Sequence, residues 1–270
     1  MRVVDLATLQ GDGTSNQDRA ITRHNYAAVL DGASQFPPRP DGHDGGWYSE
    51  RLARALAEQL DARDGNLGDA VANAIRTVAT TENLTPGDAP SSTVTIARWN
   101  AENVHVYVLG DSPAIVFLAD GTHQVVTDQR LVGVGRQQRA AYRAHLLDGH
   151  GFDTTHRQLL ADLQAEQQRK RNTTGGYWIA EADPAAGHHG YTETFPLDQV
   201  DAVLLLSDGA SAAVNKYTYP ETWPEALDAV RNDGCAAFLR HVVDVEDQDP
   251  DGTRWPRSKH HDDKTAALLA

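Results

Sequence analysis

The sequence contains a single cysteine, Cys235, so it can form no internal disulfide bond. Chains without disulfides are typical of a reducing compartment, and we therefore expect a cytoplasmic protein in which Cys235 is a buried apolar residue. No apolar run approaches the length of a membrane span. Residues 1–13 are too polar and too short for a signal peptide.

Positive charge is also scarce, because 24 Lys and Arg stand against 38 Asp and Glu, a formal net charge of −14. Such a surface repels nucleic acids and anionic membranes, so we expect neither as a partner. A linker rich in Pro, Gly or Ser is missing too, and the 270 residues are 40% hydrophobic, enough for one sizeable core. We expect one domain over residues 1–270, in a monomer.

Apolar periodicity and turn residues together predict the secondary structure. Strands are predicted at 2–9, 25–31, 91–99, 104–109, 114–119, 123–128, 177–182, 191–196, 202–207 and 264–269. Helices are predicted at 47–62, 67–81, 156–171 and 222–243, the last interrupted at Gly234. Prolines and glycines make residues 35–46 irregular, and 130–175, rich in Arg, Gln and His, form an inserted helical flap or a set of irregular loops.

Strands joined by short turns favour antiparallel pairing, and the order of strands and helices indicates the α+β class. Helices cannot cover both faces of one such sheet without long crossovers. We therefore expect an αββα sandwich, in which two antiparallel sheets pack face to face with helices outside and the flap is an insertion.

Three aspartates stand beside apolar segments that read as buried strands. Asp31 and Asp208 each end an apolar run and begin the sequence Asp-Gly-Ala-Ser, and Asp262 precedes the last strand. Carboxylates that converge repel one another unless a cation or a proton lies between them. Hard oxygen ligands suit magnesium or manganese, so a metal site is expected here, with turn formation by Asp-Gly as the weaker alternative.

A series of short motifs in a fixed order resembles the metal-dependent protein phosphatases of type 2C, and bacterial members in particular. The motifs are N-Q-D at 16–18, V-L-D-G at 29–32, S-S-T at 91–93, V-L-G-D-S at 108–112, V-V-T-D at 125–128, L-L-L-S-D-G at 204–209 and D-D-K-T at 262–265. Each is weak alone, but together they span nearly the whole chain.

The resemblance implies hydrolysis of phosphoserine and phosphothreonine in proteins by a water that bridges two Mn²⁺ or Mg²⁺ ions. It implies that Asp31 bridges both ions and Gly32 offers its carbonyl. Asp208 and Asp262 would hold one ion, and Asp18 would act on the other through water. Asp31, Asp208 and Asp262 would thus be the catalytic residues, whereas a third ion at Asp111 is doubtful. No serine nucleophile is needed.

The chain departs from the family at residues that would act on the substrate phosphate. The arginine that often precedes the first acidic motif is missing, and only Arg19 or Arg23 could replace it. Pro113 follows Gly-Asp-Ser where the family has arginine, and Ala33 stands where many eukaryotic members have a histidine general acid.

Three more departures concern the metal ligands. Gln17 replaces a glutamate, so a water-mediated contact would lose a charge. Ala212 replaces an aspartate that holds the third ion, and Asp263 replaces an asparagine. These changes keep open a second hypothesis, a degenerate member that acts as a regulatory binding module. A phosphohydrolase of another substrate is a third.

Other residues that could carry chemistry have simpler interpretations. The pairs His188-His189 and His260-His261 suggest zinc, but adjacent side chains point apart and zinc usually takes spaced ligands. His43 is expected in a solvated loop. The basic run 169–171 is expected to be the solvated end of a helix, with substrate docking as the alternative.

Overall fold

The computed structural model describes residues 1–35, 39–62 and 65–270 and contains two five-stranded antiparallel sheets. The first sheet has the spatial order β1 (Val3–Leu9), β10 (Lys264–Leu269), β9 (Val200–Leu206), β6 (Ala114–Leu118) and β7 (His123–Val126). The second has the order β2 (Asp18–Thr22), β3 (Tyr26–Asp31), β4 (Val94–Trp99), β5 (Asn103–Leu109) and β8 (Tyr191–Pro196).

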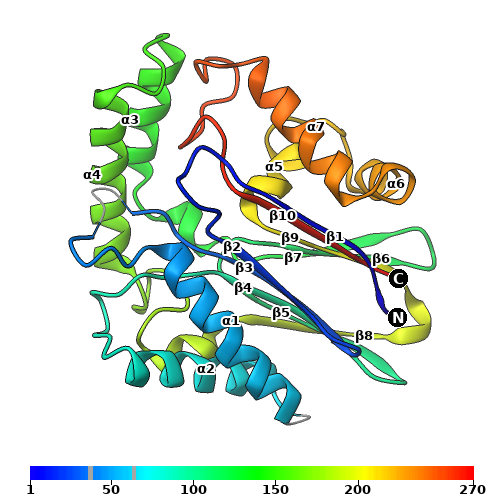
Figure 1. The fold of residues 1–270 in the computed structure, drawn as a ribbon. Coiled ribbons are helices and arrows are strands. Elements are labelled where there is room, and N and C mark those ends of the chain that lie inside the picture. Colours follow the sequence, from blue (N-terminus) through cyan, green and yellow to red (C-terminus); the bar gives the residue numbers. More distant parts are fainter. Residues whose placement is uncertain (36–38, 63–64) are drawn as a thin grey trace.

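Helices cover the outer face of each sheet, which confirms the αββα sandwich (Figure 1). The second sheet is covered by α1 (Gly45–Ala62) and α2 (Leu67–Thr81). The first sheet is covered by α5 (Asp208–Asn215), α6 (Trp223–Asp233) and α7 (Cys235–Asp247). Short 3-10 helices lie at η1 (Arg130–Gly133), η2 (Pro184–His189) and η3 (Leu197–Gln199).

Three apolar clusters correspond to the three interfaces between layers. Leu52, Leu56 and Ile75 pack between α1, α2 and the second sheet. A cluster that includes Val29 and Leu205 lies between the sheets. The third fills the space between the first sheet and α5–α7 and contains Cys235, which is buried as predicted. The two sheets are therefore buried against each other and each against its own helices.

The flap consists of two helices that stand beside the sandwich, α3 (Arg136–Leu147) and α4 (Thr154–Lys170) (Figure 1). They pack on each other through a small cluster of their own, Tyr142, Leu146, Leu160 and Leu163. The helical form of the insertion is confirmed. The sequence prediction found α4 but not α3, whose buried side chains are only Tyr142 and Leu146.

Several predicted boundaries are wrong. Residues 177–182 form no strand; Tyr177 bridges to Arg171 and Ala180 to Ser92, each in isolation. Helix α1 begins at Gly45, inside the stretch predicted as irregular, of which residues 36–38 lie outside the described residues. The interruption predicted at Gly234 is confirmed, since this glycine, with φ of 85°, separates α6 from α7, but α7 continues to Asp247, past the predicted end at residue 243. Strand β2 and helix α5 were not predicted.

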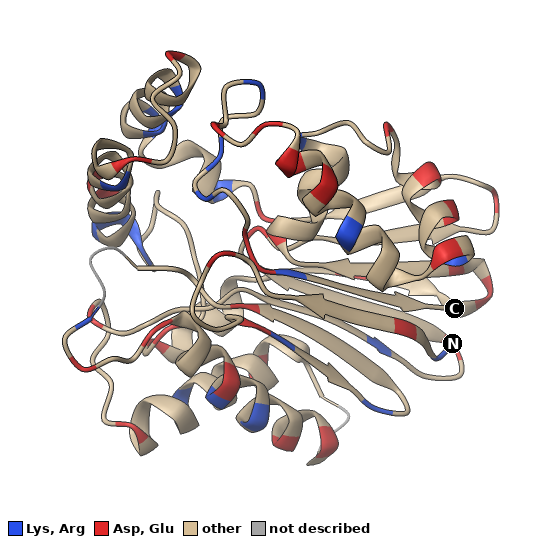
Figure 2. Cartoon of the chain, turned by 45° about the horizontal axis from the view of Figure 1, so that its top comes forward, with Lys and Arg blue, Asp and Glu red and all other residues tan. Residues whose placement is uncertain are grey.

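Acidic side chains are spread over both halves of the sandwich, with basic residues among them (Figure 2). Among the described residues, no helix is both long enough and apolar enough to cross a bilayer.

Candidate metal and phosphate site

Five aspartates meet at one end of the sandwich, although they come from distant parts of the chain. Asp18 begins β2, Asp31 ends β3, Asp111 follows β5, Asp208 begins α5 and Asp262 precedes β10. All but Asp18 line a cleft of about 960 Å³, together with Gly32 and residues of the flap. Asp18 pairs with Asp31 across β2 and β3, and its side chain is buried. The structure therefore brings together every residue that the sequence predicts as a metal ligand.

The backbone around Asp31 is held by tight contacts. The Asp31 N–H donates to the Thr93 hydroxyl at 3.1 Å, and the Asp208 N–H donates to Asp31 Oδ2 at 3.4 Å. A Cβ on Gly32 would lie 2.4 Å from the Gly45 carbonyl. The Asp-Gly sequence is thus required for close packing of two backbones, which fixes the direction of the aspartate.

Burial and mutual repulsion raise the pKa of four of these carboxyl groups. Burial is the main cause for Asp18 and raises its pKa to about 7, with Asp262 and Asp263 adding to the shift. The pKa of Asp111 is also raised to about 7 by burial and then by Asp208. Those of Asp31 and Asp208 are raised by burial and by neighbouring aspartates. Asp208 opens to the cleft, so solvent weakens the repulsion there.

Asp18 is a carboxylate for which the described residues supply no partner of opposite charge. Both of its carboxylate oxygens are buried and make no hydrogen bond to the described residues. The hydroxyls of Thr265 and Ser207 offset part of the pKa shift, but neither makes a hydrogen bond of normal geometry. Buried, unpartnered carboxylate oxygens are costly unless a cation or bound water satisfies them. The set therefore fits hard divalent cations such as Mg²⁺ or Mn²⁺.

Asp262 differs from the other four because it has a cationic partner. The Lys259 ammonium forms an ion pair with Asp262 Oδ1. Burial opposes ionisation of Asp262, but Lys259 outweighs it, and the pKa of the Asp262 carboxyl is lowered. Burial likewise opposes the charge of Lys259, yet Asp262 raises the pKa of the ammonium above its usual range. The sequence analysis missed Lys259, because a lysine three residues before an aspartate in a loop carries no pattern.

Asp263 has a structural role that explains why an aspartate is suitable there. Its carboxylate accepts the Gly11 N–H at 2.8 Å and the Gln17 N–H at 2.9 Å, and so holds the N-terminal loop against β10. Gln17 in turn accepts a hydrogen bond from Ser34 at 2.7 Å and donates to Asp44 at 3.2 Å. The side chain of Gln17 is therefore committed to loop contacts.

Neither arginine that could replace the missing phosphate ligand faces the cleft. Arg19 donates to the carbonyls of Asn16 and Asp18 and lies 3.5 Å from Glu50. Arg23 lies 3.6 Å from Asp61, on the far end of β2. The suggestion that either grips the substrate is wrong for this geometry.

In the basic run at the end of α4, Arg169 faces solvent and Arg171 faces the cleft. Arg169 is exposed and pairs with Glu166, as expected for a solvated helix end. Arg171 lines the cleft instead, donates to the Ala89 carbonyl at 3.1 Å and lies 3.8 Å from the buried Glu181. The interpretation as a solvated helix end is therefore wrong for Arg171.

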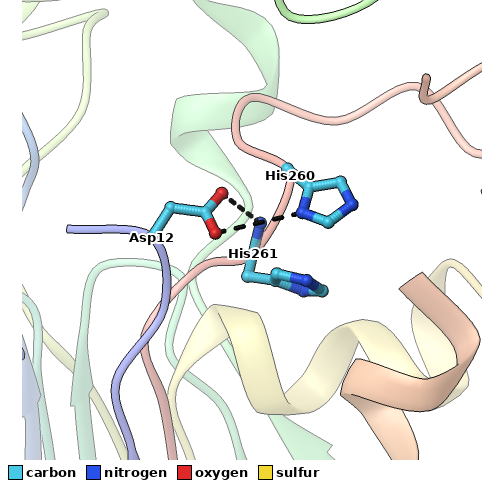
Figure 3. A group of neighbouring side chains, drawn as sticks. All are labelled: Asp12, His260 and His261. Carbon is cyan, nitrogen blue, oxygen red and sulfur yellow. Dashed lines mark hydrogen bonds and ion pairs between the residues drawn. The ribbon is translucent and has the colours of Figure 1, made fainter. Parts of the chain in front are cut away.

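The two histidine pairs lie in different places. His189 stacks on Trp178, with ring centroids 3.5 Å apart, and does not join the other pair. His260 and His261 lie together with Asp12, with ligand atoms within 4.8 Å of one another (Figure 3). This is the one trio of described Asp, Glu, His and Cys side chains with that spacing.

The His261 ring is already occupied by other partners. Its Nδ1 lies 2.8 Å from Glu246 and its Nε2 lies 3.2 Å from Asp247, whereas Asp12 accepts the His261 backbone N–H at 2.8 Å. Figure 3 shows the Asp12 carboxylate directed at that backbone nitrogen. The trio therefore serves to tie loops together and gives no support to a zinc site.

Comparisons with known proteins agree with the fold and the motif order. A sequence model described as Protein phosphatase 2C matches residues 8–244. No curated protein matches the sequence at a significant level. Since the family model covers most of the chain, the protein belongs to the protein phosphatase 2C family.

Solved structures with the same fold include bacterial serine/threonine phosphatases. The catalytic domain of PstP, solved with two manganese ions, is 17% identical, with 97% of this chain and 95% of that chain covered and a TM-score of 0.57. MsPP from Mycobacterium smegmatis is 21% identical, with 99% and 98% covered and a TM-score of 0.56. Stp1 from Staphylococcus aureus is 15% identical, with 100% and 95% covered and a TM-score of 0.60. At these identities the likeness shows the fold alone.

Proposed function

We propose that the protein is a Mn²⁺- or Mg²⁺-dependent phosphatase that hydrolyses phosphoserine and phosphothreonine in protein substrates. The observation that carries the proposal is the convergence of Asp31, Asp111, Asp208 and Asp262 on one cleft, with the unpartnered carboxylate of Asp18 behind them. Family membership gives the reaction class. We further propose that it acts as a monomer in the cytoplasm, without nucleic acid or membrane as a partner.

The donor set suggests how two ions would be held. Asp31 would contact both ions, with the Gly32 carbonyl beside it, while Asp208 and Asp262 would hold one ion and Asp18 would act through water on the other. Such ions would supply a hydroxide near neutral pH and offset the charge of the phosphate. Asp111 would serve a weaker third site, since Ala212 offers no carboxylate.

The residues of the chain contribute orientation. The hydrogen bond from the Asp208 N–H to Asp31 Oδ2 and the close approach of Gly32 to Gly45 hold two carboxylates toward the cleft. Ser34 and Ser211 bond to neighbouring groups, Gln17 at 2.7 Å and the Asp208 carbonyl at 3.1 Å. These serines thus have local roles, in keeping with hydrolysis by water.

Two substrates test the proposal, p-nitrophenyl phosphate and a phosphothreonine peptide, assayed with and without manganese. We expect manganese-dependent turnover that Asp31→Ala and Asp208→Ala each reduce by at least about a hundredfold, because removing even an outer-shell partner of a metal costs 10–100-fold. Asp120→Ala, which removes an exposed carboxylate from the turn after β6, is the matched control and should keep full activity. Turnover of the wild type no greater than that of Asp31→Ala would refute the proposal.

A regulatory binding module is the second candidate. It is favoured by the Lys259–Asp262 ion pair, which already neutralises one predicted metal ligand. It is also favoured by Arg19, whose side chain lies near Glu50 and does not face the cleft. In that case the wild type would show no turnover in the assays above and no manganese binding by calorimetric titration.

A further inference from the structure

Six basic residues line the cleft in the described part of the chain: Arg39, Arg139, Arg143, Arg171, Lys216 and Lys259. They differ in whether they already form ion pairs or hydrogen bonds with other residues of the protein. Arg39 pairs with Asp41 at 3.0 Å and with Asp88 at 3.1 Å. Arg171 is held by the Ala89 carbonyl and Glu181. Both guanidinium groups are thus already paired with acidic or carbonyl groups of the protein.

Lys259 is the cleft lysine that forms an ion pair with one of the predicted metal ligands. Its ammonium contacts Asp262 and interacts electrostatically with Asp31 and Asp208 as well. Its side chain is 21% exposed, so it is largely enclosed but open to the cleft. By contrast, Lys216 and Arg143 are exposed at the rim.

The backbone is anchored on both sides of Lys259, at Ser258 and at His260. The buried Arg257 pairs with Asp249 at 2.9 Å and donates to the His260 carbonyl at 2.9 Å. The Ser258 carbonyl lies 2.9 Å from Nε2 of His156 on the flap helix α4. The main chain that carries Lys259 is therefore held in place, and a change of partner requires only rotation of the Lys259 side chain.

A divalent cation and the Lys259 ammonium compete for the same carboxylate. A cation bound at Asp262 repels the ammonium and takes away its partner, whereas a phosphate dianion in the cleft attracts it. Lysine is suited to this exchange because its charge lies on a long stem with rotatable donors.

We propose that Lys259 is the phosphate-binding residue of this cleft, paired with Asp262 in the metal-free protein and released to the substrate phosphate when a divalent cation binds Asp262. The inference rests on the proposed function. Lys259 would bind the substrate phosphate in place of the missing N-terminal arginine. Its partner would then depend on whether a divalent cation is bound at Asp262.

Calorimetric titrations that need no turnover test this assignment. Manganese is titrated into wild type, Lys259→Gln and Lys216→Gln, and inorganic phosphate is then titrated into each manganese-loaded protein. We expect Lys259→Gln to bind manganese about twofold to fivefold more tightly, the range of a partly exposed ion pair. We expect it to bind phosphate about 10–100-fold more weakly, the range of a charged hydrogen bond.

Two controls separate a direct contact from a general effect of charge or folding. Lys216→Gln removes one positive charge from the rim of the same cleft and should keep its phosphate affinity within about twofold, as expected for an exposed charge. Lys259→Arg keeps the charge and should retain more phosphate affinity than Lys259→Gln. Manganese binding by Lys259→Gln itself shows that a loss of phosphate affinity in that variant is not a folding defect.

The outcomes distinguish this inference from the proposed function. Normal manganese binding with phosphate affinity unchanged in Lys259→Gln would overturn the inference alone. An equal loss in Lys216→Gln, or weaker manganese binding in Lys259→Gln, would also overturn it, because Lys259 would then act through the general field or by orienting Asp262. Absence of manganese binding to the wild type would overturn the proposed function and the inference with it.

Discussion

Asp18 carries an unfavourable charge behind the cleft, because its buried carboxylate has no hydrogen-bond partner among the described residues. A carboxyl whose pKa is about 7 when folded and near 3.8 when unfolded binds a proton more tightly in the folded state. Its contribution to stability is therefore fully present below pH 3.8 and is lost as the pH rises through about 7. A divalent cation would remove this cost above neutral pH.

The metal-free protein should consequently lose stability between about pH 4 and about pH 7, and Asp18→Asn should reduce this loss because asparagine cannot ionise. At pH 8, with chelator present, we expect Tm of the variant to exceed that of wild type by about 5 °C, as a gain of 1–2 kcal/mol would produce. Thermal unfolding followed by circular dichroism at several pH values checks this. Equal slopes of Tm against pH for both proteins would show that Asp18 is not the group that titrates.

At the scale of elements, the acidic segment between α7 and β10 is organised by one buried ion pair. Arg257 and Asp249 are each 3% exposed, and Asp249 also accepts the backbone N–H groups of Arg254 and Trp255. The bonds to Arg254 and Trp255 and the charge of Arg257 together outweigh burial and lower the pKa of the Asp249 carboxyl. A segment that composition alone describes as a turn-rich loop is thus a fixed support for Lys259 and Asp262.

Arg257→Met should be strongly destabilising, because it leaves the charge of Asp249 buried without its partner. We expect a loss of about 3–5 kcal/mol in the free energy of unfolding, measured with urea. Arg254→Met removes a cation that stacks on Trp255, 4.0 Å from its ring, but is otherwise exposed, and should cost far less. Similar losses in the two variants would contradict the assigned role of the buried pair.

Sequence patterns predicted the elements whose burial is regular and missed those whose burial is not. The last strand was predicted with its observed bounds, because every residue of Lys264–Leu269 is buried and most are apolar. Strand β2 was missed, since Asp18–Thr22 is short and half polar. The run at 177–182 has strand-like composition, but it makes only isolated bridges, at Tyr177 and Ala180, so tertiary pairing decided against a strand.

For the whole molecule, the sandwich explains why the ligands could be predicted and their charge partners could not. The ligands stand at strand ends, which the apolar runs mark, and two stacked sheets bring those ends to one rim (Figure 1). The paths of long side chains such as Lys259, Arg19 and Arg171 depend on neighbours from other segments and leave no periodic trace. The fold was therefore predictable from the sequence, whereas the source of phosphate binding was not.

The most direct test of the central claim is a crystal structure of the protein soaked in manganese chloride, with anomalous diffraction data collected near the manganese edge. The account predicts two anomalous peaks in the cleft, within bonding reach of Asp31, Asp208 and Asp262. Peaks only at Asp12, His260 and His261, or no peak at all, would contradict it.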